Sequence, residues 1–206
     1  NCMEALQNDK IEASLKCRLG LGKELNYEFF EEFIDEISKT GIKFIYVHAR
    51  NAILNGISPQ GNRTIPPLNY NFVKKIKSKY PNITFILNGG INNLNEAESL
   101  LKEFDGVMLG RLIKNNPFIL KEVDKKIFKE KDKLIDEAII NNYFEYIKPK
   151  LGFESIFRLL SPLLNIFFSV PHSKTYKSKI NDYMKDQKIN LIEDLLIKFV
   201  SERNLS

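Results

Sequence analysis

The sequence predicts an α/β region built on a parallel sheet, followed by an all-helical region. Between residues 12 and 110, short apolar runs alternate about four times with segments of helical spacing, which is typical of right-handed βαβ units. From about Pro117 onward every segment has helical spacing, with breaks near Pro149, at Pro171 and near Asn190. We therefore expect two domains, 1–128 and 134–206, separated by a charged joint at residues 129–133.

The expected elements follow one another closely up to Leu109. Residues 1–8 are typical of the end of a helix. Strands are expected at Glu12–Cys17, Lys43–Val47, Ile83–Leu87 and Asp105–Leu109. Helices are expected at Tyr27–Lys39, which Gly41 ends, at Phe72–Lys79, and from Asn93 to about Glu103, with Asn93 and Glu96 as a capping pair.

Composition and charge narrow the classes of partner. The 206 residues are 43% hydrophobic, which is enough for a core, but no apolar run approaches the roughly 18 residues that span a bilayer. Two cysteines, Cys2 and Cys17, predict neither a disulfide framework nor a metal site. The net charge is +5, and no acidic residue lies between Ser155 and Asn181. Such a basic face suits a polyanion, although a solvated lysine-rich surface explains the charge equally well.

Glycines follow two of the expected strands. Asn88, Gly89 and Gly90 come after the third strand, and Gly110 and Arg111 come after the fourth. Glycines there let a backbone approach a ligand closely, and free N–H groups at a helix start favour an anion. The pattern fits a phosphate group, and ordinary tight turns explain it about as well.

The stretch from Phe44 to Leu68 joins a buried strand to a long loop. His48 and Arg50 stand at strand spacing where the apolar run stops, so both can point the same way. The loop that follows is punctuated by apolar residues that favour burial, which argues against disorder. Loops of this length are usually functional, so we expect the loop to belong to a site.

The segment His-Ala-Arg-Asn-Ala-Ile-Leu-Asn-Gly-Ile-Ser-Pro-Gln-Gly-Asn-Arg-Thr-Ile-Pro-Pro-Leu, from His48 to Leu68, resembles the signature of the A subgroup of tRNA-dihydrouridine synthases. That resemblance implies an FMN-dependent (β/α)8, or TIM, barrel with a helical C-terminal domain. The four strands would be strands five to eight, so the expected fold is the second half of a TIM barrel followed by an all-helical domain. Because a half barrel has two open sheet edges, we expect this chain alone to be poorly soluble or to dimerise, and the full-length protein to be monomeric.

The resemblance also implies a reaction and a set of site residues. The reaction is the reduction of uridine to dihydrouridine in the tRNA D-loop, at position 20 or 20a, with FMN as cofactor and NADPH as reductant. A fixed ammonium at Lys16 would stabilise the negative charge of reduced flavin near N1 and the C2 carbonyl. The implied cofactor contacts are Lys16, His48, Asn88, Gly89, Gly90, Gly110 and Arg111. The implied substrate and tRNA contacts are Arg18, near the uracil, together with Arg50, Gln60, Arg63, Lys174 and Lys177; Arg50 could instead brace the loop.

The chain departs from the family at two places. The family's catalytic acid is a cysteine in an Asn-x-x-Cys-Pro motif, which is absent here, so we expect it upstream of Asn1 and assign no catalytic residue to this chain. Cys2 lies in helical sequence, and Cys17 should face away from Lys16. In the segment from Ile166 to Lys177, lysines 174 and 177 replace the family's paired arginines, and its upstream Arg-His reads Ser161-Pro162, while His172 has no assigned role.

Two other functions stay open from the sequence. One is another phosphate-binding or FMN-dependent TIM-barrel enzyme, which would have no affinity for tRNA. The other is a non-catalytic RNA-binding remnant, which would bind tRNA without flavin. The sequence leaves the compartment open between cytoplasm and organelle.

Overall fold

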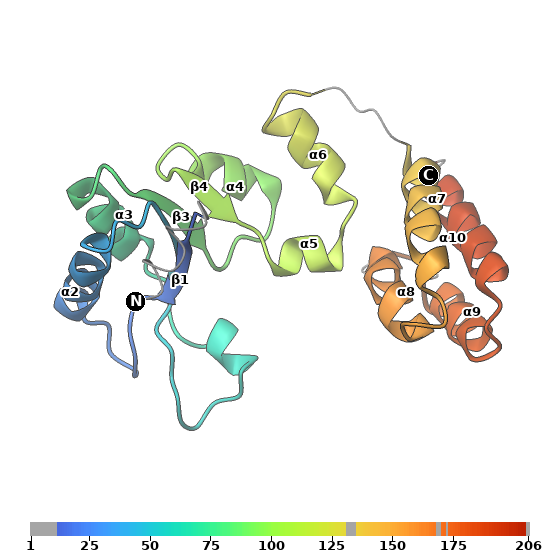
Figure 1. The fold of residues 1–206 in the computed structure, drawn as a ribbon, viewed down its shortest axis with the longest axis horizontal. Coiled ribbons are helices and arrows are strands. Elements are labelled where there is room, and N and C mark those ends of the chain that lie inside the picture. The colour runs from blue at the N-terminus through green and yellow to red at the C-terminus, as the bar shows by residue number, and fades with distance from the viewer. Residues whose placement is uncertain (1–11, 131–134, 168–169, 172, 205–206) are drawn as a thin grey trace. The chain divides into compact units, whose positions relative to one another are not determined.

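The computed structural model describes residues 12–130, 135–167, 170–171 and 173–204. It divides into two compact units, Asn1–Gly110 and Arg111–Ser206 (Figure 1). The division falls earlier in the chain than the expected boundaries of 128 and 134. The helix expected at residues 1–8 and most of the charged joint lie outside the described residues.

The first unit is an α/β structure with a parallel sheet, which confirms the predicted class. Its strands pair in the order β1-β2-β3-β4, and every pair is parallel. The strands are β1 Ser14–Arg18, β2 Phe44–His48, β3 Thr84–Asn88 and β4 Gly106–Met108, and the helices are α2 Tyr27–Ser38, η1 Gly61–Arg63, α3 Tyr70–Lys79 and α4 Leu94–Leu100. The strands and α-helices begin close to their expected positions, although β4 is shorter than its apolar run and α4 ends three residues before the expected Glu103. The short helix η1 was not expected.

Asparagines start the three longer helices of this unit. The side-chain oxygens of Asn26, Asn69 and Asn93 accept hydrogen bonds from backbone N–H groups in the first turns of α2, α3 and α4. The expected capping pair forms, because Glu96 also accepts a bond from the N–H of Asn92 at 2.9 Å. Each cap satisfies a donor that a helix start would otherwise leave unpaired.

The two faces of the sheet have different neighbours. Ile45, Val47, Phe85 and Leu87 alternate along β2 and β3 and are buried in one cluster with Phe30 and Ile34 of α2 and Val73 and Ile76 of α3. The opposite face carries Lys16 in register with Tyr46 and Ile86, and then Arg18 in register with His48, Asn88 and Met108. The second row marks the carboxyl ends of the strands, where ligands bind in parallel α/β sheets.

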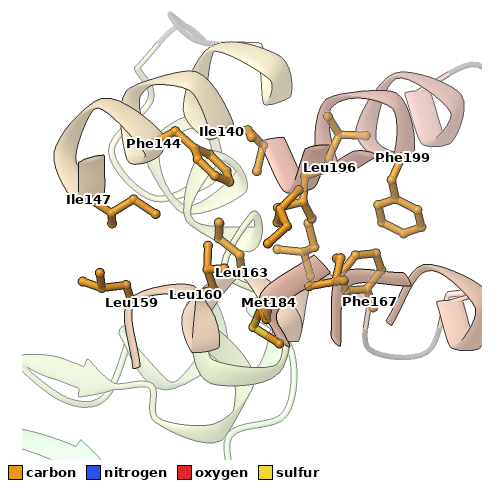
Figure 2. Packing of buried hydrophobic residues seen from close by; sticks show 14 of the residues in the cluster. Ile140, Phe144, Ile147, Leu159, Leu160, Leu163, Phe167, Met184, Leu196 and Phe199 are labelled. Atoms are coloured by element: carbon orange, nitrogen blue, oxygen red, sulfur yellow. The ribbon is translucent and has the colours of Figure 1, made fainter. Parts of the chain in front are cut away.

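The second unit consists of helices around a core of its own. Its elements are α5 Arg111–Asn115, α6 Ile119–Lys126, α7 Asp136–Ile147, η2 Lys148–Lys150, α8 Ile156–Leu164, η3 Asn165–Phe167, α9 Ser173–Lys185 and α10 Ile189–Asn204. Figure 2 shows Phe144 of α7, Leu160 of α8, Met184 of α9 and Leu196 of α10 converging in that core. Phe118 belongs to the same cluster, which explains why residues 111–128 group with the helices rather than with the sheet.

Candidate functional site

Two side chains and a backbone carbonyl meet at the carboxyl ends of the strands. Lys16 reaches across β2, and its Nζ donates a hydrogen bond to Oδ1 of Asn88 at 3.2 Å. Nδ2 of Asn88 donates in turn to the carbonyl of Met108 at 2.8 Å. Asn88 therefore links β1 to β4 and fixes where the Lys16 ammonium lies. The sequence placed both residues at the site but did not predict this link.

The ammonium of Lys16 lies in a site that disfavours positive charge. Partial burial lowers the pKa of Lys16, and the nearby positive charge of Arg18 lowers it further. An anionic ligand beside Lys16 would reverse this effect by stabilising the ammonium. The pair of cations therefore suits a negatively charged group.

Of the two glycines after β3, Gly89 packs on His48 and Gly90 packs on Leu68. Gly89 has φ +112°, and a Cβ at this position would lie 2.5 Å from Cδ2 of His48. Gly90 has φ +76°, and its Cβ would lie 2.3 Å from Cδ1 of Leu68. The Tyr70 hydroxyl donates to the carbonyl of Gly89 at 2.6 Å. His48 is only 9% exposed, so this turn, which only glycine fits, determines how the imidazole is covered.

Side chains help to hold the long loop after β2, together with the short helix η1 and a backbone bridge between Leu21 and Ala52. Nη1 of Arg18 donates to the carbonyls of Asn51 at 2.8 Å and Asn62 at 2.9 Å. The amide of Asn62 bonds both the N–H and the carbonyl of Ile53, at 2.8 and 2.6 Å. Asn51 is buried, and its Nδ2 donates to the carbonyls of Gly22 and Glu24. Asn51 and Asn62 are structural residues of the site that sequence reasoning missed.

Arg50 lies within the same loop rather than at its surface. It is 8% exposed, and its Nη1 donates to the carbonyls of Pro66 and Thr64. This geometry is that of a brace, the alternative left open for Arg50 from the sequence. Its assignment to tRNA stays a prediction.

Gln60 and Arg63 are displayed where the loop forms the short helix η1. Gln60 precedes the helix, Arg63 ends it, and both side chains are exposed. Burial lowers the pKa of Arg18, and the positive charge of Arg63 lowers it further, which places the two guanidinium groups within electrostatic reach. A polyanion bound here would meet both charges.

Cys17 lies on the other face of β1, as its position between Lys16 and Arg18 predicted. The side chain packs against the cluster under α2 and α3, and burial raises the pKa of the thiol to about 12. It therefore does not point into the site. Cys2 lies outside the described residues.

The remaining predicted residues are distributed over both units. Gly110 ends the first unit and Arg111 opens α5 in the second, with the Arg111 side chain exposed. Lys174 and Lys177 lie in the first turns of α9, where Lys174 is exposed and Lys177 partly so. Their roles stay predictions.

The described residues contain no group of three or more His, Cys, Asp or Glu that could hold a metal ion. In the same residues, no helix has both the length and the apolar character needed to cross a membrane.

The parallel βα units define an α/β protein. The cationic and amide side chains and the glycine turn at the carboxyl ends of its strands have the chemistry that an anionic ligand requires. The chain belongs to the dihydrouridine synthase (Dus) family, which matches residues 1–202. It is 34% identical over 209 residues to the tRNA-dihydrouridine(20/20a) synthases of Shigella flexneri and Escherichia coli K12, covering 98% of this chain and 61% and 60% of those proteins. It is 39% identical over 129 residues to that of Pseudomonas putida, covering 62% of this chain and 38% of that protein. The chain thus spans about three fifths of the length of the first two relatives.

Proposed function

We propose that this chain is the part of a tRNA-dihydrouridine synthase that contains the second half of a TIM barrel and the helical tRNA-binding domain. The complete enzyme would reduce uridine 20 or 20a of tRNA with FMN and NADPH. Family membership supports the reaction class, and the names of the relatives support the position modified. The order of parallel strands supports the barrel half, because four consecutive βα units follow one another without a break.

The donors at the strand ends fit a flavin. Lys16 offers an ammonium, Asn88 an amide and His48 an imidazole, all from one edge of the sheet. When bound, FMN would supply the hydride for C6 of the uracil. Lys16 would hold the flavin's N1 and C2 carbonyl side and stabilise negative charge there, while Asn88 would keep the ammonium in position.

The glycine turns suit a phosphate better than the N-terminus of α4 does. The carboxylate of Glu96 already accepts the N–H of Asn92 there, so a phosphate at that point would meet a like charge. We propose that backbone groups at Gly89, Gly90 and Gly110 hold the phosphate. The phosphate contact expected of Arg111, a bidentate donor, stays a prediction, because Arg111 belongs to the other unit.

The substrate would be bound by the loop after β2. Gln60 and Arg63 would contact the tRNA, and Arg18 would lie between the loop and the uracil. Lys174 and Lys177 would add phosphate contacts from the helical unit, which makes binding salt-sensitive. Cys17 would not supply the proton for C5 of the uracil, because it packs against the core of the sheet unit.

The single observation that carries the proposal is the hydrogen bond from Lys16 to Asn88 at the carboxyl edge. It joins two of the residues that the family resemblance assigned to the cofactor, although they are 72 positions apart in the chain.

The test uses the complete protein with FMN, NADPH and tRNA that lacks dihydrouridine. We expect a yellow preparation and formation of dihydrouridine at position 20 or 20a, measured by mass spectrometry of nuclease fragments. Lys16→Met should slow reduction of the flavin roughly 10²-fold, because it removes a fixed charge from the site. Lys23→Met, a change of an exposed lysine in the loop after β1, should leave the rate unchanged.

Each rival function has its own outcome. A colourless protein that binds tRNA would favour the RNA-binding remnant, and a yellow protein without affinity for tRNA would favour another flavin enzyme. Equal rates for Lys16→Met and Lys23→Met would contradict the role of Lys16.

A further inference from the structure

We propose that the corner between α7 and α8 is a stacking site for unpaired RNA bases, formed by Phe153 and Phe157 with Tyr146 and the cations beside them. It lies entirely in the second unit and is separate from the residues assigned to tRNA above. The proposal rests on the proposed function for the identity of the RNA.

Phe153 is presented by a rigid turn. The N–H groups of Phe153 and Glu154 both donate to the carbonyl of Lys150, at 3.2 and 3.1 Å, and Gly152 has φ +90°. The backbone of this turn is therefore fixed by its own hydrogen bonds. The side chain that it holds is nevertheless 91% exposed, which is the largest exposed fraction among the exposed large apolar residues of the described chain.

Phe157 follows in the first turn of α8. Ser155 caps this helix by accepting the N–H of Arg158 at 3.2 Å, so the turn leads directly into the helix. Phe157 is 62% exposed. Arg158, beside it, forms an exposed ion pair with Glu154 at 3.0 Å, and such a pair is easily exchanged for a phosphate contact because it contributes little in water.

A third ring lies at the end of α7. Tyr146 is 61% exposed, and Nζ of Lys150 lies 4.6 Å from its ring centroid. A lysine over a ring offers a cation–π contact and a charge for a neighbouring phosphate. The thirteen residues from Tyr146 to Arg158 thus contain three aromatic rings, three cations and one carboxylate, Glu154. Of the cations, Lys148 is paired with Glu145 and Glu193, so Lys150 and Arg158 are the two beside the rings.

The surroundings favour RNA over an apolar protein partner. Glu154 and Ser155 are exposed between the two phenylalanines, so the rings stand singly among polar groups rather than in one continuous apolar patch. No acidic residue lies from Ser155 to Asn181, so the chain that leaves the corner carries only positive charge. Flat rings between cations are what proteins use to bind single-stranded nucleic acid.

The first test measures tRNA affinity of the complete protein. The double variant Phe153→Leu/Phe157→Leu keeps the apolar character but removes both stacking faces, so we expect binding weaker by roughly tenfold or more. The salt dependence should keep its slope, because no phosphate contact is lost. Phe128→Leu is the matched control, since Phe128 is 66% exposed in the same unit and should not affect affinity. Unchanged affinity of the double variant would overturn the proposal.

The second test reports contact with the base directly. The 206 residues contain no tryptophan, so Phe153→Trp introduces a single fluorescent reporter into this chain. We expect its emission to be that of an exposed ring, and to be quenched by a single-stranded oligouridine more strongly than by an RNA duplex of equal length. Phe128→Trp should show no such difference. Equal quenching by both RNAs, or a blue-shifted emission before RNA is added, would overturn the proposal, the latter because protein would already cover the ring.

The proposed function and the proposed stacking site can be contradicted independently. Absence of dihydrouridine formation would contradict the proposed function but leave selective quenching by single-stranded RNA intact. If the enzyme is active, the double leucine variant should raise KM for tRNA and leave kcat unchanged, whereas Lys16→Met lowers kcat.

Discussion

At Gly89 a single hydrogen atom in place of a side chain determines how close the backbone comes to His48. We expect Gly89→Ala to destabilise the first unit, because the new Cβ would lie 2.5 Å from Cδ2 of His48 and the residue has φ +112°. The left-handed backbone alone costs about 1 kcal/mol, and the forced shift of the ring adds about 1–3 kcal/mol. Denaturant unfolding measures the free energy, and flavin absorbance measures cofactor retention.

Gly56 provides the matched control for this change. It has φ +86°, but nothing lies within 4 Å of the position its Cβ would take. Gly56→Ala should therefore cost only the backbone term and should keep flavin binding intact. Equal losses of stability for the two variants would show that His48 moves away freely and that the close approach has no consequence.

Cys17 makes the stability of the chain depend on alkaline pH. Burial raises the pKa of its thiol from 9.0 to about 12 in the folded state, so the folded state favours the neutral form. This contribution is fully present below about pH 9 and is lost as the pH rises from 9 towards 12. We expect the unfolding free energy of the native chain to fall faster than that of Cys17→Ala between pH 9 and 10.5, by at most about 1.4 kcal/mol per pH unit. Parallel pH profiles would contradict the buried thiol.

At the scale of the element, the loop after β2 depends on Asn62. Its amide pairs with both backbone groups of Ile53. We expect Asn62→Ala to leave these groups unpaired and to destabilise the loop by about 1–3 kcal/mol. Faster hydrogen exchange at the amide of Ile53 and faster proteolysis within the loop would measure this effect, together with weaker tRNA binding through Gln60 and Arg63.

The loop supplies its own control. Asn55 is exposed in the same loop, so Asn55→Ala should leave exchange and proteolysis unchanged. If Asn62→Ala leaves exchange and proteolysis as unchanged as Asn55→Ala does, the bonds of Arg18 rather than the amide of Asn62 hold the loop in place.

Elements of the sheet could be predicted from sequence because their signals are local. Alternating apolar residues placed β2 and β3 within a residue of their positions, and Asn93 with Glu96 predicted the start of α4.

The sequence could predict the site only as a set of residues at the ends of strands. The bonds that assemble it, from Arg18 to Asn51 and Asn62, join residues 33 and 44 positions apart and have no local pattern. Residues 111–128 were expected with the sheet, and the compact units divide after Gly110, because Phe118 packs with the helices that follow it.

At the scale of the whole molecule, the expected association of the chain on its own stays a prediction. Among the described strands, β1 and β4 each pair on one side only, which leaves backbone groups available to another copy. Light scattering during size exclusion would measure it, and a monodisperse monomer would contradict it.

The two units have separate cores, and this predicts how the chain unfolds. Phe85 is fully buried in the cluster of the sheet unit, and Phe144 is fully buried in the cluster of the helical unit. Replacing either by alanine removes about 3–5 kcal/mol of packing, but only from its own cluster. We expect Phe85→Ala to accelerate hydrogen exchange in peptides from the sheet unit alone, and Phe144→Ala to do so in peptides from α7 to α10 alone. If the two units unfolded cooperatively, the loss of packing in one unit would also destabilise the other. Faster hydrogen exchange in the peptides of both units, in each variant, would therefore mean that the chain unfolds as one body.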